Sequence, residues 1–195
     1  MSQVALRGIA RFSKFLFVLA LLLMSTQVAL AGADKVTLQE GADITFIKRL
    51  AVCQPMYIQV NENGIGKDTL TKVIYDASKV TNLYVISYDE IAQNIKSAKE
   101  VDIKALDWRK AAKEFKDNVG DFADAYVLLT VANNSRTECF FDVYQTGSNE
   151  LLYTYRILAD RADQDTAETF NSLCEQFYKN LDRSMANQRK EYQKK

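Results

Sequence analysis

Residues 75–79 read Tyr-Asp-Ala-Ser-Lys, which is the spacing of the proton-transfer pair in short-chain reductases. In such an enzyme the tyrosine is the acid, and the lysine one helical turn later lowers its pKa and binds the cofactor ribose. A dinucleotide site also needs a Gly-x-Gly-x-x-Gly loop after the first strand, and this chain has none. We therefore expect no reductase activity, and we expect Tyr75 and Lys79 on the solvent side of a helix.

Two other patterns that suggest chemistry each lack an essential part. Gly66-Lys67 opens a predicted helix as a phosphate loop does, but Asp68 stands where a Ser or Thr would bind magnesium. The acidic run from Asp160 to Asp165 lacks the glycine and the distal Glu of a calcium loop. The chain also has no histidine, the commonest general base and zinc ligand. We therefore expect a non-catalytic protein without a metal site or a cofactor.

The first segment has the organisation of a secretory signal. Basic residues precede an apolar run from Phe15 to Met24, and a triplet of small residues ends at Ala31. The apolar run is shorter than the roughly 20 residues that span a bilayer, which favours cleavage over a permanent membrane anchor. We expect residues 1–31 to be a signal peptide cleaved near Ala31. The mature protein would then be periplasmic or secreted, without an integral membrane span.

Charge and cysteine content restrict the partners and the cross-links. The 25 basic residues balance the 25 acidic ones, and the expected signal holds only basic charges, so the mature chain is slightly acidic. Nucleic acid is therefore not an expected partner, because its binding needs a clustered basic face. Three cysteines are too few for a disulfide framework at this length. Buried free thiols are the favoured interpretation, and one bridge between Cys139 and Cys174 is the alternative.

Hydrophobic periodicity predicts a single α/β domain. Residues 44–54 are apolar on both faces of a strand, which is typical of a central strand, and Pro55 should end it. The order β-α-β-α-α-β-β-β-α predicts one mixed sheet of about five strands covered by helices. The remaining expected elements are helices at 67–82, 89–99, 107–120 and from 165 onward, and strands at 82–88, 124–132, 136–146 and 150–158.

Finer expectations concern helix ends and buried faces. Asp89 should cap the second helix, and Trp108 should belong to the buried stripe of the third. Asp165 and Glu168 are spaced like a capping box for the last helix. Phe170, Leu173, Phe177 and Leu181 should form the buried stripe of that helix, and its buried contact should stop near Arg183.

These patterns divide the mature chain into a polar lead-in over 32–45, the α/β domain over 46–183 and a basic helix end over 184–195. The helix end is either a frayed, solvated tail or a docking arm for an acidic partner or an anionic lipid surface. The basic residues concerned are Arg183, Arg189, Lys190, Lys194 and Lys195.

Four short segments resemble those of a group of bacterial envelope proteins. They are RLAV before Pro55, NLYVISYDEI, ADAYVLLTV and FFDVYQTGSNELL. The group includes the amino-terminal domain of TolB, the periplasmic domain of the curli secretion lipoprotein and the lipoprotein activators of peptidoglycan synthases. The resemblance covers about residues 46–182, and it implies an adaptor fold that binds other envelope components, with no catalytic residues to carry over. The chain lacks the lipid-bearing Cys and the propeller of these relatives.

The leading hypothesis is a periplasmic α/β domain without catalysis that binds or scaffolds another envelope component, expected to be a protein. The alternative is a small-ligand carrier with a pocket at the carboxyl ends of the parallel strands, near Met56, Tyr57 and Tyr88. An enzyme is the third hypothesis.

Overall fold

The computed structural model describes residues 34–58, 64–133, 136–160 and 165–194. The expected signal peptide and Lys195 lie outside these residues. Asp34–Lys195 form one compact unit. Among the helices of the described residues, none has the length and hydropathy needed to cross a membrane.

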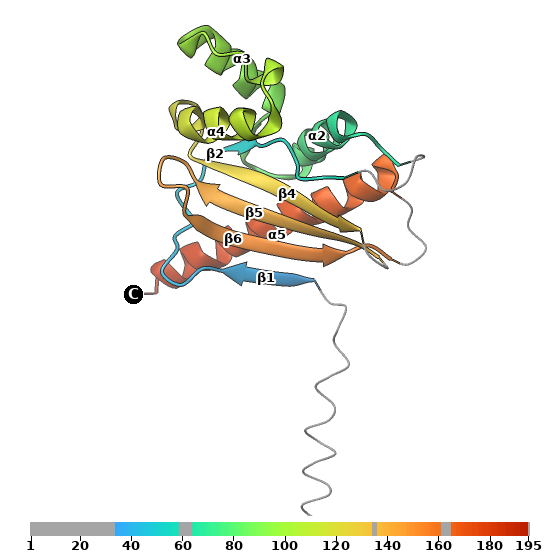
Figure 1. Cartoon of the computed structure of the whole chain (residues 1–195). Coiled ribbons are helices and arrows are strands. Elements are labelled where there is room, and N and C mark those ends of the chain that lie inside the picture. Colours follow the sequence, from blue (N-terminus) through green and yellow to red (C-terminus); the bar gives the residue numbers. More distant parts are fainter. Residues whose placement is uncertain (1–33, 59–63, 134–135, 161–164, 195) are drawn as a thin grey trace, which may run out of the picture. The chain divides into compact units, whose positions relative to one another are not determined.

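The centre of the fold is a mixed six-stranded sheet in the order β1-β6-β5-β4-β2-β3 (Figure 1). β2 is parallel to both of its neighbours, β3 and β4, whereas the remaining pairs are antiparallel. The predicted α/β class and the predicted order of elements are confirmed, with one strand more than expected. The strands are β1 (Lys35–Leu38), β2 (Arg49–Val52), β3 (Tyr84–Ile86), β4 (Ala125–Asn133), β5 (Thr137–Gln145) and β6 (Leu151–Leu158).

Helices cover the two faces of this sheet unequally. α2 and the long α5 pack on one face, with α5 running behind β4, β5 and β6, whereas α3 and α4 pack over β2 and the adjacent end of β4 (Figure 1). The helices are α2 (Lys67–Asp76), α3 (Tyr88–Lys99), α4 (Trp108–Asn118) and α5 (Ala167–Tyr192), with single 3-10 turns η2 (Ala77–Val80), η3 (Ile103–Ala105) and η4 (Val119–Asp121).

The additional strand, β1, lies where the sequence indicated a polar lead-in. It pairs antiparallel with β6, with Lys35 opposite Arg156 and Leu38 opposite Tyr153. All four of its residues are exposed, including Val36 and Leu38, which alternate with polar residues, and four residues are too short a stretch to predict a strand by themselves. Its conformation comes from backbone pairing with the edge of the sheet, which a propensity pattern does not report.

The core on the α5 side is built from stacked aromatic rings. Phe141 of β5 stacks on Phe177 of α5 at 4.6 Å between centroids, and Phe177 contacts Tyr178 at 4.9 Å. The buried Tyr178 hydroxyl donates to the carbonyl of Ile74 at 3.0 Å, which ties α5 to α2. The predicted apolar stripe of the last helix is thereby confirmed: Phe170, Leu173, Phe177 and Leu181 are all buried.

The second core lies between the sheet and the α3–α4 pair. Phe115 of α4 is completely buried; it stacks on Tyr88 at 5.8 Å and meets Tyr126 of β4 edge-on at the same distance. Ala51 and Cys53 complete this cluster from the other face of β2. The prediction that β2 is apolar on both faces and central is confirmed, because its residues contribute to both cores.

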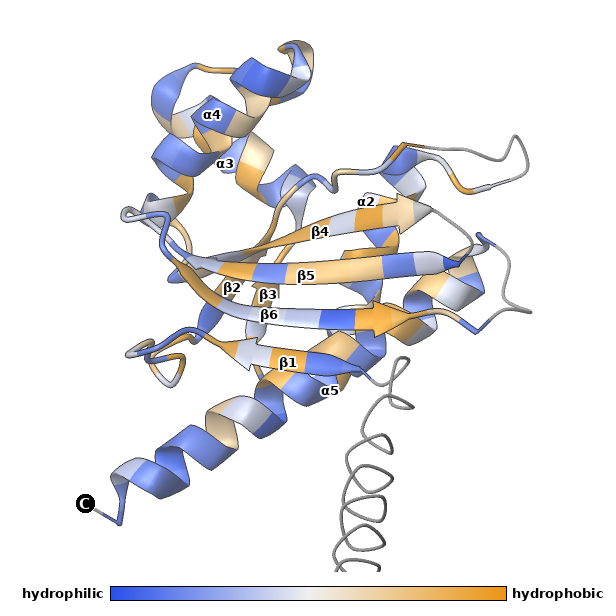
Figure 2. Cartoon of the chain, turned by 60° about the horizontal axis from the view of Figure 1, so that its bottom comes forward, coloured by the Kyte–Doolittle hydropathy of each residue, from blue (hydrophilic) through white to orange (hydrophobic). Residues whose placement is uncertain are grey.

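The buried part of α5 extends beyond the position at which the sequence placed its end. Met185 and Gln188 are both buried, so the expected stop near Arg183 is wrong. The Gln188 side-chain oxygen accepts from Ile44 N at 2.9 Å, and its amide nitrogen donates to Ala42 O at 2.7 Å. A polar residue carries this contact because its partners are backbone groups of the segment before β2. Figure 2 shows α5 crossing the sheet and continuing past β1.

Two capping expectations from the sequence are also wrong. α3 is capped by Ser87, whose hydroxyl accepts from Glu90 N, and not by Asp89. α5 is capped by Thr166, which accepts from Thr169 N. Asp165 is not the capping residue, since its carboxylate accepts from the Thr137 hydroxyl at 2.8 Å and so ties the start of α5 to β5.

Trp108 is the first residue of α4 and is 60 % exposed, so it does not belong to the buried stripe. The preceding residue, Asp107, caps the helix by accepting from two backbone N–H groups. Trp108 lies in the first turn of α4, outside the face with which Ala111 and Phe115 contact the core.

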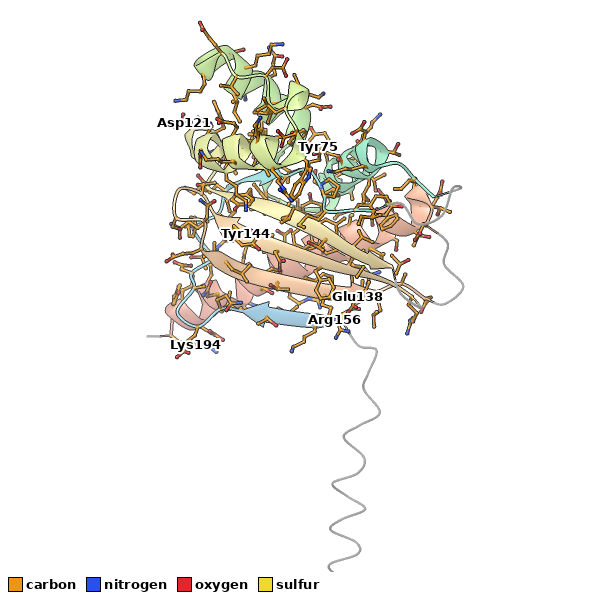
Figure 3. All side chains as sticks on the ribbon, in the orientation of Figure 1. Tyr75, Asp121, Glu138, Tyr144, Arg156 and Lys194 are labelled. Carbon is orange, nitrogen blue, oxygen red and sulfur yellow. The ribbon has the colours of Figure 1, made fainter. Side chains whose placement is uncertain are left out.

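No helix in the described part of the chain covers the front of β5 and β6 (Figure 1). Glu138 and Arg156 form an ion pair on this face, and Tyr144 lies farther along β5 (Figure 3). The Arg156 guanidinium also lies 6.0 Å from the Phe140 ring. The mixture of polar and partly buried apolar side chains is typical of an antiparallel sheet with one solvated face.

Asp124 joins the beginnings of β2 and β4. One carboxylate oxygen accepts from the N–H groups of Lys48 and Arg49 at 2.9 and 2.8 Å, and the other pairs with the Arg49 guanidinium at 3.1 Å. Burial of the Asp124 carboxyl group raises its pKa, but the hydrogen bonds from Arg49 and Lys48 outweigh burial, so the pKa lies below its usual value.

We predict that Asp124→Ala lowers the free energy of unfolding by about 2 kcal/mol at pH 7, because two backbone donors and Arg49 lose an ionised acceptor. A lowered folded-state pKa stabilises the protein above the unfolded value of about 3.9, and this contribution disappears as the pH falls through the folded value. The difference from the wild-type chain should therefore shrink in urea titrations at pH 3. The matched control is Asp121→Ala, which removes only a surface pair with Lys99; equal losses in both variants would contradict the prediction.

We predict that Gln188→Ala lowers the free energy of unfolding by about 1–3 kcal/mol, because it leaves the Ile44 N–H and the Ala42 carbonyl without their partner. Amide hydrogen exchange at Ile44 should become faster. The neighbouring exposed Asn187→Ala should stay within about 0.5 kcal/mol of the wild-type chain. Unchanged protection of Ile44 in Gln188→Ala would show that this contact does not anchor α5.

Candidate functional site

The topology of the parallel strands creates a crevice between β2 and β3. The chain leaves β2 toward α2 on the α5 face, and it leaves β3 toward α3 and α4 on the opposite face (Figure 1). Neighbouring strands whose connections diverge in this way form a topological switch point, where open α/β sheets bind ligands. A cleft of about 760 Å³ lies at this position.

The ends of two strands and two helical walls line the cleft. Gln54 is the second residue after β2, and Ser87 comes directly after β3. One wall is the exposed side of α2, and the other comes from η3 and the start of α4. The lining residues are Gln54, Lys67, Asp68, Thr71, Lys72, Tyr75, Asp76, Ser87, Tyr88, Asp89, Ile103, Lys104, Leu106, Trp108 and Ala111.

Aromatic rings lie both on the floor and on the walls of the cleft. Tyr88 is buried and stacks on Phe115, so it belongs to the floor. Tyr75 and Trp108 are 36 % and 60 % exposed and come from opposite walls, with Tyr75 on α2 beside α4 (Figure 3). The Arg109 guanidinium lies 5.2 Å from the Trp108 ring, which restricts the orientation of that ring.

The charges that line the cleft balance each other. The lining includes three lysines, at positions 67, 72 and 104, and three aspartates, at positions 68, 76 and 89. Lys104 Nζ donates to the Asp89 carboxylate at 2.7 Å, and this hydrogen bond raises the pKa of Lys104. Burial, with smaller contributions from nearby acidic groups, raises the pKa of Tyr88 to about 12. Both groups therefore keep their protons at neutral pH.

The pocket residues expected from the sequence separate in the structure. Tyr88 lines the cleft, whereas Met56 and Tyr57 do not. Met56 is 53 % exposed, and its backbone pairs in parallel with Thr130 of β4. Tyr57 is buried on the α5 side, against Phe170 at 6.0 Å. After Pro55 the chain follows β4 instead of turning over the end of β3, and this path carries both side chains away from the cleft.

Sequence reasoning assigned no site role to the two exposed aromatics of the cleft. Tyr75 and Lys79 are exposed, as expected for the solvent side of a helix, and Lys79 pairs with Asp76. Tyr75 nevertheless faces the cleft. Trp108 was placed in the core because its helical spacing matches the buried stripe. Its position directly after the capping Asp107 is the signal that indicates exposure.

The three cysteines are buried free thiols, so no bridge joins Cys139 and Cys174 in this structure. Burial raises the pKa of Cys53 and Cys139 to about 12, and it raises that of Cys174 well above its usual value. Protonated, buried thiols are poor nucleophiles. Among the residues that the structure describes, no group of three or more acidic or cysteine side chains is placed to hold a metal ion.

We predict that no thiol reacts rapidly with an aromatic disulfide reagent in the native protein at pH 8, because all three cysteines are buried and protonated. In denaturant without reductant, three thiols per chain should react. A single reactive thiol after denaturation would show that a bridge forms in the oxidising compartment.

The basic end of α5 stands on a regular helix. The helix continues to Tyr192, and the buried Gln188 holds it against the segment before β2. Four basic residues of this end, Arg183, Arg189, Lys190 and Lys194, are exposed. The described part of this segment is therefore helical, which differs from the frayed tail considered from the sequence.

The sequence matches no family model and no curated protein. Solved structures with a similar fold include the PelC dodecamer from Paraburkholderia phytofirmans, at 8 % identity and a TM-score of 0.42 over 77 % of this chain and 98 % of that chain. The LpoB C-terminal domain from Escherichia coli is 14 % identical with a TM-score of 0.44, over 62 % and 88 % of the two chains.

The hypothetical protein CT253 from Chlamydia trachomatis is 9 % identical with a TM-score of 0.34, over 56 % and 68 % of the two chains. At these identities the resemblance concerns the fold alone.

Proposed function

We propose that this chain is an exported, non-catalytic domain that binds another component of the cell envelope in the cleft between α2 and the α3–α4 pair. The observation that carries the proposal is the cleft itself, which lies at the switch point between β2 and β3. The signal pattern of residues 1–31 supports an envelope location.

The electrostatics of the cleft support binding without catalysis. A general acid or base works best when its pKa lies near the operating pH. The pKa of Tyr88 is raised to about 12, and that of Lys104 is raised from an already high value, so both shifts lead away from neutrality. Lys104 of η3 and Asp89 of α3 form an exposed ion pair at the cleft.

Blocking the cleft tests this proposal. Thr71 lies on the cleft wall of α2, whereas Thr69 is exposed on the same helix outside the lining. Thr71→Tyr should fill the cleft, and Thr69→Tyr is the matched control. Each protein is crosslinked in the intact envelope of its host and recovered with its bound components. The component recovered with the wild-type chain and with Thr69→Tyr should disappear in Thr71→Tyr; equal recovery in all three would overturn the proposal.

A second candidate is a soluble small-ligand carrier. It is favoured by the volume of the cleft, about 760 Å³, which falls within the roughly 300–1,000 Å³ of small-molecule sites. Native mass spectrometry of protein purified from its host separates the candidates. A bound small-molecule mass, without a crosslinked envelope component, would support the carrier.

We also propose that the basic end of α5 is a docking arm for an acidic surface of an envelope protein. We predict that changing Arg189, Lys190 and Lys194 together to Gln weakens recovery of such a partner, because the end of α5 loses three exposed positive charges. The loss should be large at low salt and small at high salt, where exposed charges are screened.

The matched control changes Lys79, Lys99 and Lys113 to Gln, which removes three exposed charges from weak surface pairs elsewhere. Thermal unfolding of both triple variants should match the wild-type chain. Recovery at low salt that is undiminished in the α5 variant would exclude this end as a docking surface.

A further inference from the structure

The cleft contains enough charge to exclude two classes of ligand. Six of its lining residues are lysine or aspartate, whereas the buried centres of protein–protein interfaces are depleted in exactly these types of residue, Lys and Asp. A protein segment that filled the cleft would have to desolvate these charges, and each desolvated charge without a partner is unfavourable. The lining is therefore better suited to a ligand that keeps polar groups in every direction.

The sign of the charges restricts the ligand further. The three lysines and three aspartates of the lining balance, and one pair, Lys104 with Asp89, is already joined at 2.7 Å. A polyanion or a phosphate group would be attracted by the lysines and repelled by Asp68 and Asp76. The charged side chains of the lining sum to zero, so the balance favours a ligand that is neutral and polar.

The exposed rings supply the complementary apolar surface. Trp108 and Tyr75 come from opposite walls. Arg109 lies over one face of the Trp108 ring, and the other face, like the Tyr75 ring, has a negative quadrupole. A saccharide ring has an apolar face of positively polarised C–H groups, which such rings attract, and an edge of hydroxyl groups. Gln54, Thr71 and Ser87 add polar groups to the lining. The Thr71 hydroxyl donates to Lys67 O and can still accept, the Ser87 hydroxyl accepts from Glu90 N and can still donate, and the Gln54 amide can do both.

We propose that the cleft binds a neutral oligosaccharide, with sugar rings stacked on Trp108 and Tyr75 and hydroxyl groups hydrogen-bonded to the polar residues between them. The inference rests on the proposed function and specifies its ligand: the envelope component in the cleft is a glycan chain. A volume of about 760 Å³ leaves room for a short stretch of such a chain, since sites of roughly 300–1,000 Å³ enclose drug-sized ligands.

The chain contains its own reporter for this test. Trp108 is the only tryptophan in the sequence, and it lies on the wall of the cleft. A sugar stacked on the ring replaces water there, so occupancy should shift and change the tryptophan emission. The protein purified from its host is titrated with a panel of neutral glycans that covers hexose, N-acetylhexosamine and deoxyhexose oligomers. Inorganic phosphate, a sulfated glycan and an unrelated tripeptide are the comparison probes.

At least one neutral glycan should change the emission saturably, and the three comparison probes should not. Tyr75→Ala should weaken the binding of that glycan at least tenfold, as measured by calorimetry, whereas Tyr75→Phe should restore it because the ring is kept. Tyr84→Ala is the matched control, since Tyr84 is 61 % exposed on β3 outside the lining. Thermal unfolding of each variant shows that the fold is retained.

If no neutral glycan binds saturably, the inference is overturned. A stronger response to phosphate, to the sulfated glycan or to the tripeptide would overturn it as well. Equal binding by the Tyr75→Ala and Tyr84→Ala variants would place the glycan elsewhere and overturn it as well. These failures differ from a failure of the proposed function. If Thr71→Tyr still abolishes recovery of an envelope component while no glycan binds, the cleft is a binding site for another class of ligand.

Discussion

The structure depends on the burial of β2 from both sides. Leu50 and Val52 pack into the core beneath α2 and α5, while Ala51 and Cys53 pack under α3 and α4. A strand with two apolar faces would expose apolar side chains if one face were in contact with solvent, so helices cover both of its faces. The connection after β2 and the connection after β3 therefore leave on opposite sides of the sheet. The crevice between them is a direct result of this constraint.

The remaining strands are under a weaker constraint. β5 and β6 bury only the side chains that face α5, where Phe141, Tyr153 and Phe177 form the aromatic core. Their other face carries polar and partly buried residues such as Asp142 and Thr154, which are joined by a hydrogen bond of 2.6 Å. One long helix is enough to stabilise this half. The α3–α4 pair packs over β2, and the first turn of α4 forms part of one wall of the cleft.

The cleft combines features that no single element has. The exposed side of α2 supplies Tyr75 and a set of balanced charges, and the beginning of α4 supplies Trp108. The floor is the buried Tyr88. A neutral lining with two exposed rings differs from the centre of a protein interface and from an anion site. This combination connects the proposed role in the cell envelope with a glycan as the ligand.

The sequence by itself determined the fold class, the order of the elements after β1, the apolar stripe of α5 and the exposure of Tyr75 and Lys79. These features follow from local periodicity, because a helix or strand that covers a core must repeat its apolar residues at its own period. Tertiary structure alone decided the pairing of β1, the burial of Gln188 and the choice of Ser87 and Thr166 as caps. Each of these depends on backbone partners that are distant in the chain or on competing polar groups nearby. The cleft is also decided by tertiary structure: Tyr88 could be placed from the end of a strand, but Tyr75 and Trp108 line the same cleft only because α2 and α4 lie on opposite faces of β2.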